Sequence, residues 1–299
     1  MNWYKDNLKE WKEIIRVISS EIKKDEITIE KDTIQSMFLY ELSKSDIPFV
    51  FKGGTSLSKA FDLIERFSED IDLSLPFDPT ESQKRKVYDT IMVISKNLGL
   101  ELENSENVKS RYDYNKYIFS YNSLFSSSKL EIIVETSFYT PVYPVENRNI
   151  QCYVGKFCYE NALILPVKFR GVSFEMNVQS LRRTIIDKVF ALCDYYLQNK
   201  FERYSRHIYD IAKILPCIVV DQDLKKLTKQ IRLDRAKSKN NPSAMPAVNI
   251  NEILKEIIDK RLFEKDYNFI TNKLLYESFS YEKAIEEGIK KILEYNIFE

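Results

Sequence analysis

Adjacent glycines mark the first segment whose residue types and spacing could do chemistry. Gly53 and Gly54 follow an apolar run and precede Thr55 and Ser56, where a helix could begin. Glycine lets the main chain approach an anion closely, and the first N–H groups of a helix are free to bind phosphate. We expect both hydroxyls and the ammonium group of Lys59, one turn later, to add donors. The alternative is an ordinary capped turn, and the spacing is not that of a Walker A loop.

A pair of aspartates spaced by one residue forms the second segment. If Asp70 and Asp72 lie on a strand, both carboxylates point to the same face. Like charges this close repel unless a cation lies between them, and Mg²⁺ prefers carboxylate and phosphate oxygens. A third carboxylate could complete a two-metal site, and Glu131 and Glu135 share one face of the predicted strand 129–138. The alternative is an acidic strand edge that faces solvent.

Two later helical segments carry charged residues beside an apolar face. Lys188 falls among apolar residues of the segment 180–198, so it either extends to solvent or meets a nucleotide phosphate in a cleft. Arg206 and Asp210 are four apart and share one helix face, either as a surface ion pair or as groups that contact the nucleotide. We interpret His207, the one histidine, as structural. The sequence has no G-x-S-x-G elbow, which argues against a hydrolase that uses serine and His207.

Hydrophobic periodicity indicates the elements that must position these residues. The amino-terminal half mixes helices and strands, and the remainder is helical. The expected architecture is α+β, with a first domain at 1–178 and a helical second domain at 179–299. Residues 141–178 show no clear pattern, and the polar stretch 236–247 predicts a mobile loop. The predicted helices are 3–20, 27–44, 55–67, 81–98, 180–198, 203–215, 222–233, 250–260 and 281–294, and the predicted strands are 47–51, 70–75, 114–121 and 129–138.

Composition and charge narrow the class of protein. The 299 residues are 44% hydrophobic and 30% charged, and 45 basic residues balance 45 acidic ones, so overall charge gives no case for nucleic-acid binding. A basic cluster within 225–239 could still bind RNA locally. No apolar run approaches the about 20 residues that cross a bilayer, and the start lacks a signal peptide, so we expect a cytoplasmic protein without a membrane partner. The cysteines lack C-x-x-C spacing and are expected to be reduced.

Four motifs, taken in order, resemble those of the AbiEii/AbiGii toxin family of nucleotidyltransferases, the toxin half of abortive-infection and type IV toxin–antitoxin pairs. The family's first motif is G-G-T-x-L-x-K after a strand, and its second is R-x-S-x-D-x-D. The third is a lysine followed by an apolar helix, and the fourth is R-x-x-x-D. A carboxylate shortly before Ser-Phe favours Glu135 over Glu131. The matching residues are Gly53, Gly54, Thr55, Leu57 and Lys59, then Arg66, Ser68, Asp70 and Asp72, then Lys188, and finally Arg206 and Asp210.

This resemblance implies a DNA-polymerase-β-like nucleotidyltransferase core, in which a small mixed sheet is flanked by helices and followed by a helical region. It implies Mg²⁺, with Mn²⁺ as the alternative, and transfer from a nucleoside triphosphate with release of pyrophosphate. It also implies roles for the residues of the motifs. These are Asp70, Asp72 and Glu135 as metal ligands; Gly53, Gly54, Thr55, Ser56, Lys59 and Arg206 in nucleotide binding; and Asp70, Asp72, Lys188 and Asp210 in catalysis.

The resemblance also bears on partners. Some relatives look like transferases that add nucleotides to the 3′ end of tRNA, and an antitoxin normally restrains them. We therefore expect a tRNA acceptor and a cognate antitoxin. One alternative is a nucleotidyltransferase that modifies a protein or a small-molecule hydroxyl, such as that of an antibiotic, because it would share the same motifs. Another is a non-catalytic nucleotide-binding interaction protein on a decayed transferase fold.

Overall fold

The chain divides into two compact units, and each is described by itself. The structure is a computed structural model that describes residues 5–66, 68–164 and 171–299. The units are 1–62 with 69–178, and 63–68 with 179–299. The short segment 63–68 thus belongs to the second unit, whereas the predicted boundary near 178 assigned it to the first. Among the described residues, no helix is long and apolar enough to span a membrane.

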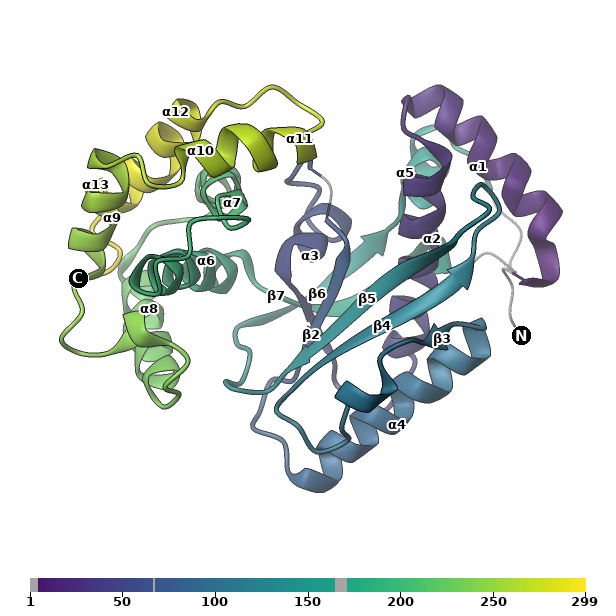
Figure 1. The fold of residues 1–299 in the computed structure, drawn as a ribbon, viewed down its shortest axis with the longest axis horizontal. Coiled ribbons are helices and arrows are strands. Elements are labelled where there is room, and N and C mark those ends of the chain that lie inside the picture. Colours follow the sequence, from purple (N-terminus) through teal and green to yellow (C-terminus); the bar gives the residue numbers. More distant parts are fainter. Residues whose placement is uncertain (1–4, 67, 165–170) are drawn as a thin grey trace. The chain divides into compact units, whose positions relative to one another are not determined.

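Seven strands of the described residues form one mixed sheet in the first unit (Figure 1). In chain order they are β1 (Val50–Lys52), β2 (Asp70–Ser74), β3 (Glu101–Leu102), β4 (Tyr114–Asn122), β5 (Lys129–Ser137), β6 (Val145–Gln151) and β7 (Ser173–Gln179). They lie side by side in the order β3-β4-β5-β2-β1-β7-β6. The central strand β2 runs antiparallel to β1 and parallel to β5, and β4 pairs with β5 in the antiparallel sense.

The α-helices among the described residues of the first unit are α1 (Leu8–Ile22), α2 (Glu26–Ser43), α3 (Gly53–Lys59), α4 (Glu81–Leu98) and α5 (Tyr153–Glu160). Side-chain caps explain where α2 and α4 begin. The Asp25 carboxylate accepts a hydrogen bond from the Thr28 N–H at the start of α2 (2.8 Å). Thr80 and Gln83 form a capping box at α4, and Gly99 ends that helix in left-handed backbone (φ 69°).

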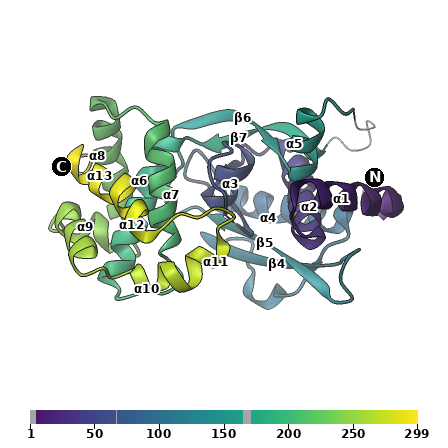
Figure 2. The same cartoon turned by 90° about the horizontal axis from the view of Figure 1, so that it is seen from above.

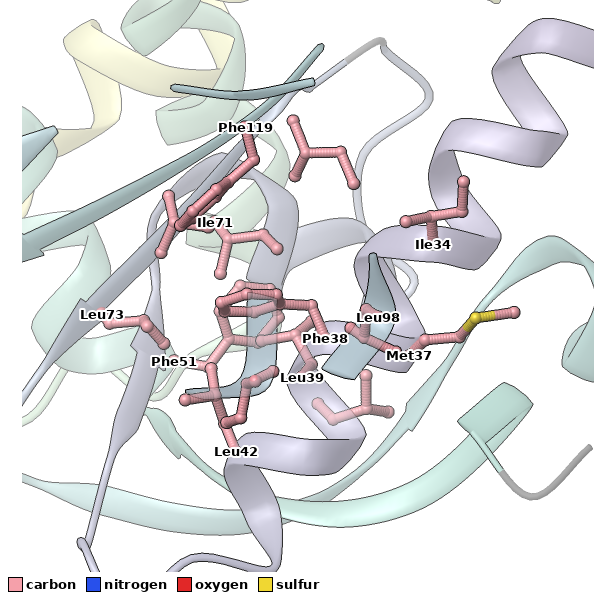
Figure 3. Packing of buried hydrophobic residues seen from close by; sticks show 14 of the residues in the cluster. Ile34, Met37, Phe38, Leu39, Leu42, Phe51, Ile71, Leu73, Leu98 and Phe119 are labelled. Atoms are coloured by element: carbon pink, nitrogen blue, oxygen red, sulfur yellow. The ribbon is translucent and has the colours of Figure 1, made fainter. Parts of the chain in front are cut away.

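The apolar side chains of β1 and β2 pack against α2 (Figure 3). Phe51 of β1, together with Ile71 and Leu73 of β2, is fully buried, and all three lie close to Phe38 and Leu42 of α2. Because side chains alternate along a strand, the intervening residues of β2 must point to the opposite face. The core therefore decides which way the two aspartates of β2 are directed.

The second unit is helical. Its helices are α6 (Leu181–Leu197), α7 (Arg206–Ile214), α8 (Gln222–Ala236), α9 (Ile250–Asp259), α10 (Glu264–Asp266), α11 (Asn272–Leu274), α12 (Tyr281–Ala284) and α13 (Lys291–Glu294). Helices α6 and α7 lie side by side and bury Val189 and Ile211 in the core (Figure 2). The π-helical turn Ile285–Lys290 approaches α7 closely, since a Cβ atom at Gly288 would lie 3.2 Å from Cα of Ala212.

Several segments differ from the sequence-based predictions. The helix expected at 55–67 ends with α3, and the left-handed backbone of Asp62 (φ 53°) follows it. The region without a clear pattern contains β6, α5 and β7. The loop expected to be mobile at 236–247 is anchored, because the buried N–H of Ser243 donates to the Asp194 carboxylate (2.8 Å). Tertiary hydrogen bonds of this kind leave no trace in hydrophobic periodicity.

Candidate active site

The first glycine of the pair occupies a position that another residue could fill only with strain. Gly53 begins α3 directly after β1, with φ at 79°, a conformation that L side chains rarely adopt. A Cβ atom there would lie 1.8 Å from Oδ2 of Asp72. The Asp72 carboxylate therefore lies directly against the main chain of the glycine corner, which we define as the strand-to-helix turn at residues 52–54.

Three carboxylates share the face of the sheet opposite the α2 core. Asp70 and Asp72 are partly exposed. The residue that follows each of them, Ile71 and Leu73, is fully buried on the other face. The register of the parallel pair places Asp72 directly beside Glu135 of β5. Paired residues of neighbouring strands point to the same face. The register thus places Asp70, Asp72 and Glu135 on one face of two neighbouring strands, and we call these residues the carboxylate row.

The other candidate for the third carboxylate lies outside the carboxylate row. Glu131 is exposed and pairs with Ser120 of β4. The pairing of β2 with β5 begins only at Asp70 and Ile133. Four residues of strand separate Glu131 from Glu135, which corresponds to about 13 Å. Of the two glutamates, Glu135 is the one in register with an aspartate.

The donor chemistry of the carboxylate row fits Mg²⁺ or Mn²⁺ that arrives with a nucleotide. Mg²⁺ is usually bound by one or two carboxylates plus substrate phosphates and seldom by a closed protein cage. Across the part of the chain that the structure describes, no three His, Cys, Asp or Glu side chains are grouped as a ready metal cage. Asp72 with one neighbouring carboxylate therefore matches a metal shared with phosphate oxygens.

The hydroxyl groups that follow the glycines bond to the protein itself. The Thr55 hydroxyl donates to the main-chain carbonyl of Asp70 (2.6 Å), and the Ser56 hydroxyl donates to the carbonyl of Gly53 (2.9 Å). Both residues are buried. The Thr55 bond fastens α3 to β2, and the Ser56 bond lies within the first turn of α3. Both differ from the expectation that the hydroxyls donate to phosphate. Gly54 occupies the second position of α3, and phosphate binding by the main chain there stays a prediction.

Lys59 also differs from its expected role. Its buried ammonium group pairs with the Asp32 carboxylate, and it donates to the carbonyl of Asp32 (2.9 Å) and to Oγ of Ser36 (3.2 Å). All of these oxygens belong to α2, so Lys59 ties α3 to α2. The contacts contradict the expectation that Lys59 reaches the phosphates, because its donors are already taken in a buried setting.

Two lysines extend the carboxylate row on either side, and the sequence prediction missed both. Lys52 of β1 is the register partner of Asp72, and Lys116 of β4 is the partner of Glu135. Burial raises the pKa of the neighbouring Tyr114, and the negative charge of Glu135 raises it further. Lys52 could have been proposed from the sequence, because it directly precedes the two glycines. Strand register, which reveals Lys116, cannot be read from local sequence.

A buried ion cluster in the second unit contains two residues that were expected to be catalytic. Oδ1 of Asp210 accepts from Nε of Arg66 (2.7 Å), and Oδ2 accepts from Nη2 of Arg66 (2.8 Å) and from Nζ of Lys188 (2.6 Å). Burial would raise the pKa of Asp210, but the charges of both cations hold it well below its usual range. Burial lowers the pKa of Lys188, and Asp210 opposes that shift. Lys188 is buried and does not extend to solvent.

The arginine that shares a helix face with Asp210 lies outside this cluster. Arg206 and Asp210 do not form the surface ion pair that their spacing allows, because Asp210 is fully buried and bonds to other cations. The His207 ring stacks on Tyr195 with centroids 5.7 Å apart, and burial lowers the pKa of His207 well below its usual value. These contacts agree with a structural role for His207.

Comparisons with known proteins assign the family. The sequence profile described as nucleotidyl transferase AbiEii toxin, type IV TA system, matches residues 37–291. The nucleotidyltransferase toxin MenT4 from Mycobacterium tuberculosis has a similar structure (15% identity, TM-score 0.53, 94% of this chain and 88% of that chain). An H. pylori protein whose assignment as a nucleotidyltransferase is provisional gives 17% identity and a TM-score of 0.49 over 90% of this chain and 97% of that chain.

No curated protein matches the sequence. The likeness to MenT4 concerns the fold, and it confirms the expected α+β class with a mixed sheet flanked by helices. The family profile covers most of the chain and includes every residue of the carboxylate row and of the buried ion cluster. The chain therefore belongs to the AbiEii family of nucleotidyltransferase toxins from type IV toxin–antitoxin systems.

Proposed function

We propose that this toxin transfers a nucleotide from a nucleoside triphosphate to the 3′ hydroxyl of tRNA, with Mg²⁺ as cofactor (Mn²⁺ as the alternative) and with release of pyrophosphate. The observation that carries the proposal is the carboxylate row, with the Asp72 carboxylate against the glycine corner. Family membership implies a nucleotide substrate and an antitoxin partner. The basic residues within 225–239 offer a local site for RNA in a chain without net charge.

In this proposal, the site residues of the first unit have separate roles. Asp70, Asp72 and Glu135 would hold the divalent cations. Bound metal lowers the pKa of the attacking hydroxyl and offsets the charge of the phosphates. The acceptor oxygen forms a bond to the α-phosphorus while the bond from that phosphorus to pyrophosphate breaks. The glycine corner binds the outer phosphates, and Lys52 supplies the cation there that Lys59 cannot, because Lys52 is in register with Asp72.

For the second unit, we propose that Lys188, Asp210 and Arg206 serve the nucleotide. Asp210 opposes the effect of burial on the pKa of Lys188, and in this proposal the ammonium group offsets negative charge on a phosphate. Arg206 begins α7, and no ion pair engages it within the described residues, so its guanidinium group can bind an anion. These roles rest on the motifs and on the chemistry of the side chains.

A transfer assay with four separately labelled NTPs tests the proposal. The acceptors are total tRNA, the same tRNA with its 3′ end oxidised by periodate, total protein, and an aminoglycoside. We expect label in tRNA and none in oxidised tRNA. Label in protein or in the aminoglycoside, and not in tRNA, would show that the acceptor is a protein or a small molecule. Absence of transfer to any acceptor, together with absence of an NTP- and Mg²⁺-dependent thermal shift, would favour a non-catalytic protein.

Replacement of Glu135 by glutamine should lower transfer at least about 10-fold, because a metal ligand should matter at least as much as the groups that orient one. Glu131→Gln is the matched control, since it removes the same charge from the same strand and face without touching the pairing of β5 with β2. Labelled-nucleotide incorporation compares the two. Loss of transfer in Glu131→Gln alone would make Glu131 the third carboxylate.

Replacement of Gly53 by alanine should abolish transfer, because the new methyl group would occupy the place of the Asp72 carboxylate. The left-handed backbone should also cost about 1–2 kcal/mol of stability. Gly99→Ala places alanine in the same kind of backbone at the end of α4 and should cost similar stability without loss of transfer. Chemical denaturation and the transfer assay separate the two effects. Equal transfer by both variants would show that the close packing on Asp72 is not required.

A further inference from the structure

A row of alternating charge crosses the open face of the sheet. Strand register aligns Lys52 of β1 with Asp72 of β2, Asp72 with Glu135 of β5, and Glu135 with Lys116 of β4. The two inner residues are carboxylates that a divalent cation could share, and the two outer residues are lysines. The side chains of all four point to the same face, because directly paired residues do.

The contact between Lys116 and Glu135 is the kind that a stronger cation can displace. Nζ of Lys116 lies 3.5 Å from Oε1 of Glu135, and the two side chains are 42% and 22% exposed. A partly exposed ion pair of this length contributes little stability, because water screens it. A divalent cation carries twice the charge and binds carboxylate oxygens directly.

We propose that Lys116 is a built-in counter-cation, which holds Glu135 in the metal-free protein and gives it up to a divalent metal. Lys116 is thus a positioning residue that acts through Glu135. Its charge disfavours binding of a free metal ion, and the negative triphosphate reverses that balance when metal and nucleotide arrive together. The inference rests on the proposed metal site and adds a reason for metal to enter with substrate.

The groups that face Glu135 support this role. Asp72 lies on one side, and Lys116 and Tyr114 lie on the other. Lys116 is the positive group of β4 that is paired with this carboxylate. A cross-strand pair whose carboxylate binds no metal could have the same distance, but its lysine would have no effect on Mn²⁺ affinity.

Titration with Mn²⁺, followed by electron paramagnetic resonance of the free ion, tests the inference without a catalytic readout. In the absence of nucleotide, Lys116→Met should bind Mn²⁺ about two- to fivefold tighter than wild-type protein, the range expected when one exposed charge contact is removed. Lys116→Arg should match wild type. Lys129→Met, which removes an exposed lysine paired with Glu101 away from the carboxylate row, should also match wild type. A non-hydrolysable triphosphate should reduce the difference between Lys116→Met and wild type.

The possible failures are distinguishable. If wild-type protein binds Mn²⁺ in the presence of the triphosphate, but Lys116→Met binds free Mn²⁺ equally or more weakly, the counter-cation role is wrong and the metal site stands. If wild-type protein binds no Mn²⁺ even with the triphosphate, the proposed metal site is wrong, and the role of Lys116 that depends on it is wrong too. Thermal unfolding of each variant confirms that the compared proteins are folded.

Discussion

Replacement of Asp72 by asparagine should lower nucleotide transfer at least about 100-fold, because changes in groups that only orient metal ligands already cost about 10- to 100-fold. Asp72 is the residue of the candidate site that lies next to both other parts of it. It is in register with Glu135 on one side and lies against Gly53 on the other. Asparagine keeps the size of the side chain and removes the charge that binds a hard cation. The measurement is labelled-nucleotide incorporation at saturating NTP and metal.

The same variant should be about as stable as wild-type protein without metal. Loss of the charge relieves the repulsion by Asp70 and Glu135, but it also removes the attraction to Lys52, the register partner of Asp72 on β1. Asp78→Asn removes an exposed carboxylate just after β2 and should change neither transfer nor the unfolding temperature. Wild-type transfer by a folded Asp72→Asn protein would refute the metal site. Loss of transfer together with loss of fold would assign Asp72 a structural role.

Local pattern was sufficient to orient the aspartates but not to find their partners. Alternation from Asp70 to Leu73 predicted one polar and one apolar face, and the buried Ile71 and Leu73 confirm it. The choice between two glutamates of β5 depends on the register between strands that are far apart in sequence. A one-residue slip would turn every side chain of β5 to the other face. Register is a property of the assembled sheet, so local sequence left the choice open.

The segment after α3 shows why periodicity overextended a helix. Leu57 and Ile64 share one predicted helical face, and both are buried. However, Leu57 belongs to the first unit and Ile64 to the second, because the chain passes from one to the other after Asp62. Residues that appeared to form one apolar helix face are therefore buried in the cores of two different units. The role of Lys59 was also predicted wrongly, because its buried partners on α2 lie 27 and 23 positions earlier in the chain. Local sequence does not reveal such distant contacts.

The buried ion cluster joins residues that the sequence placed in separate motifs. Arg66 and Asp210 are 144 positions apart, yet the guanidinium group of Arg66 binds both oxygens of the Asp210 carboxylate. The motifs predicted that both residues matter, and the fold supplies the reason that they meet. Spacing on α7 favoured Arg206 as the partner of Asp210, because helical periodicity reports neighbours on one helix and not across helices.

Replacement of Asp210 by asparagine should lower the free energy of unfolding by about 3–5 kcal/mol, because it leaves two buried cations without their anion. Arg66, Lys188 and Asp210 are almost completely buried, so water cannot solvate the remaining charges. Asp223→Asn is the control. It breaks an exposed ion pair with Lys226 and should cost less than about 0.5 kcal/mol. Urea unfolding measures both variants. Equal stability of Asp210→Asn and wild type would mean that the cluster contributes nothing.

The loss should depend on pH in a defined direction. The two cations hold the pKa of Asp210 in the folded state below the about 3.9 of an unfolded aspartate. The ionised carboxylate therefore adds stability above that pH, and the contribution is lost as pH falls toward the folded pKa. The difference between wild type and Asp210→Asn should be constant at about pH 5–7 and shrink below about pH 4. A difference that grows on acidification would contradict this account.

An apolar replacement of the whole cluster separates stability from function. When well-packed hydrophobic side chains replace a buried ion cluster, stability is often unchanged or improved. The triple variant Arg66→Met, Lys188→Met and Asp210→Leu should therefore recover most of the stability that Asp210→Asn loses. Transfer should be lost in the triple variant, because the proposed contact of Lys188 with phosphate needs the ammonium group. Recovery of both stability and transfer would show that the cluster serves only the fold, whereas recovery of stability alone would assign its charges to the reaction.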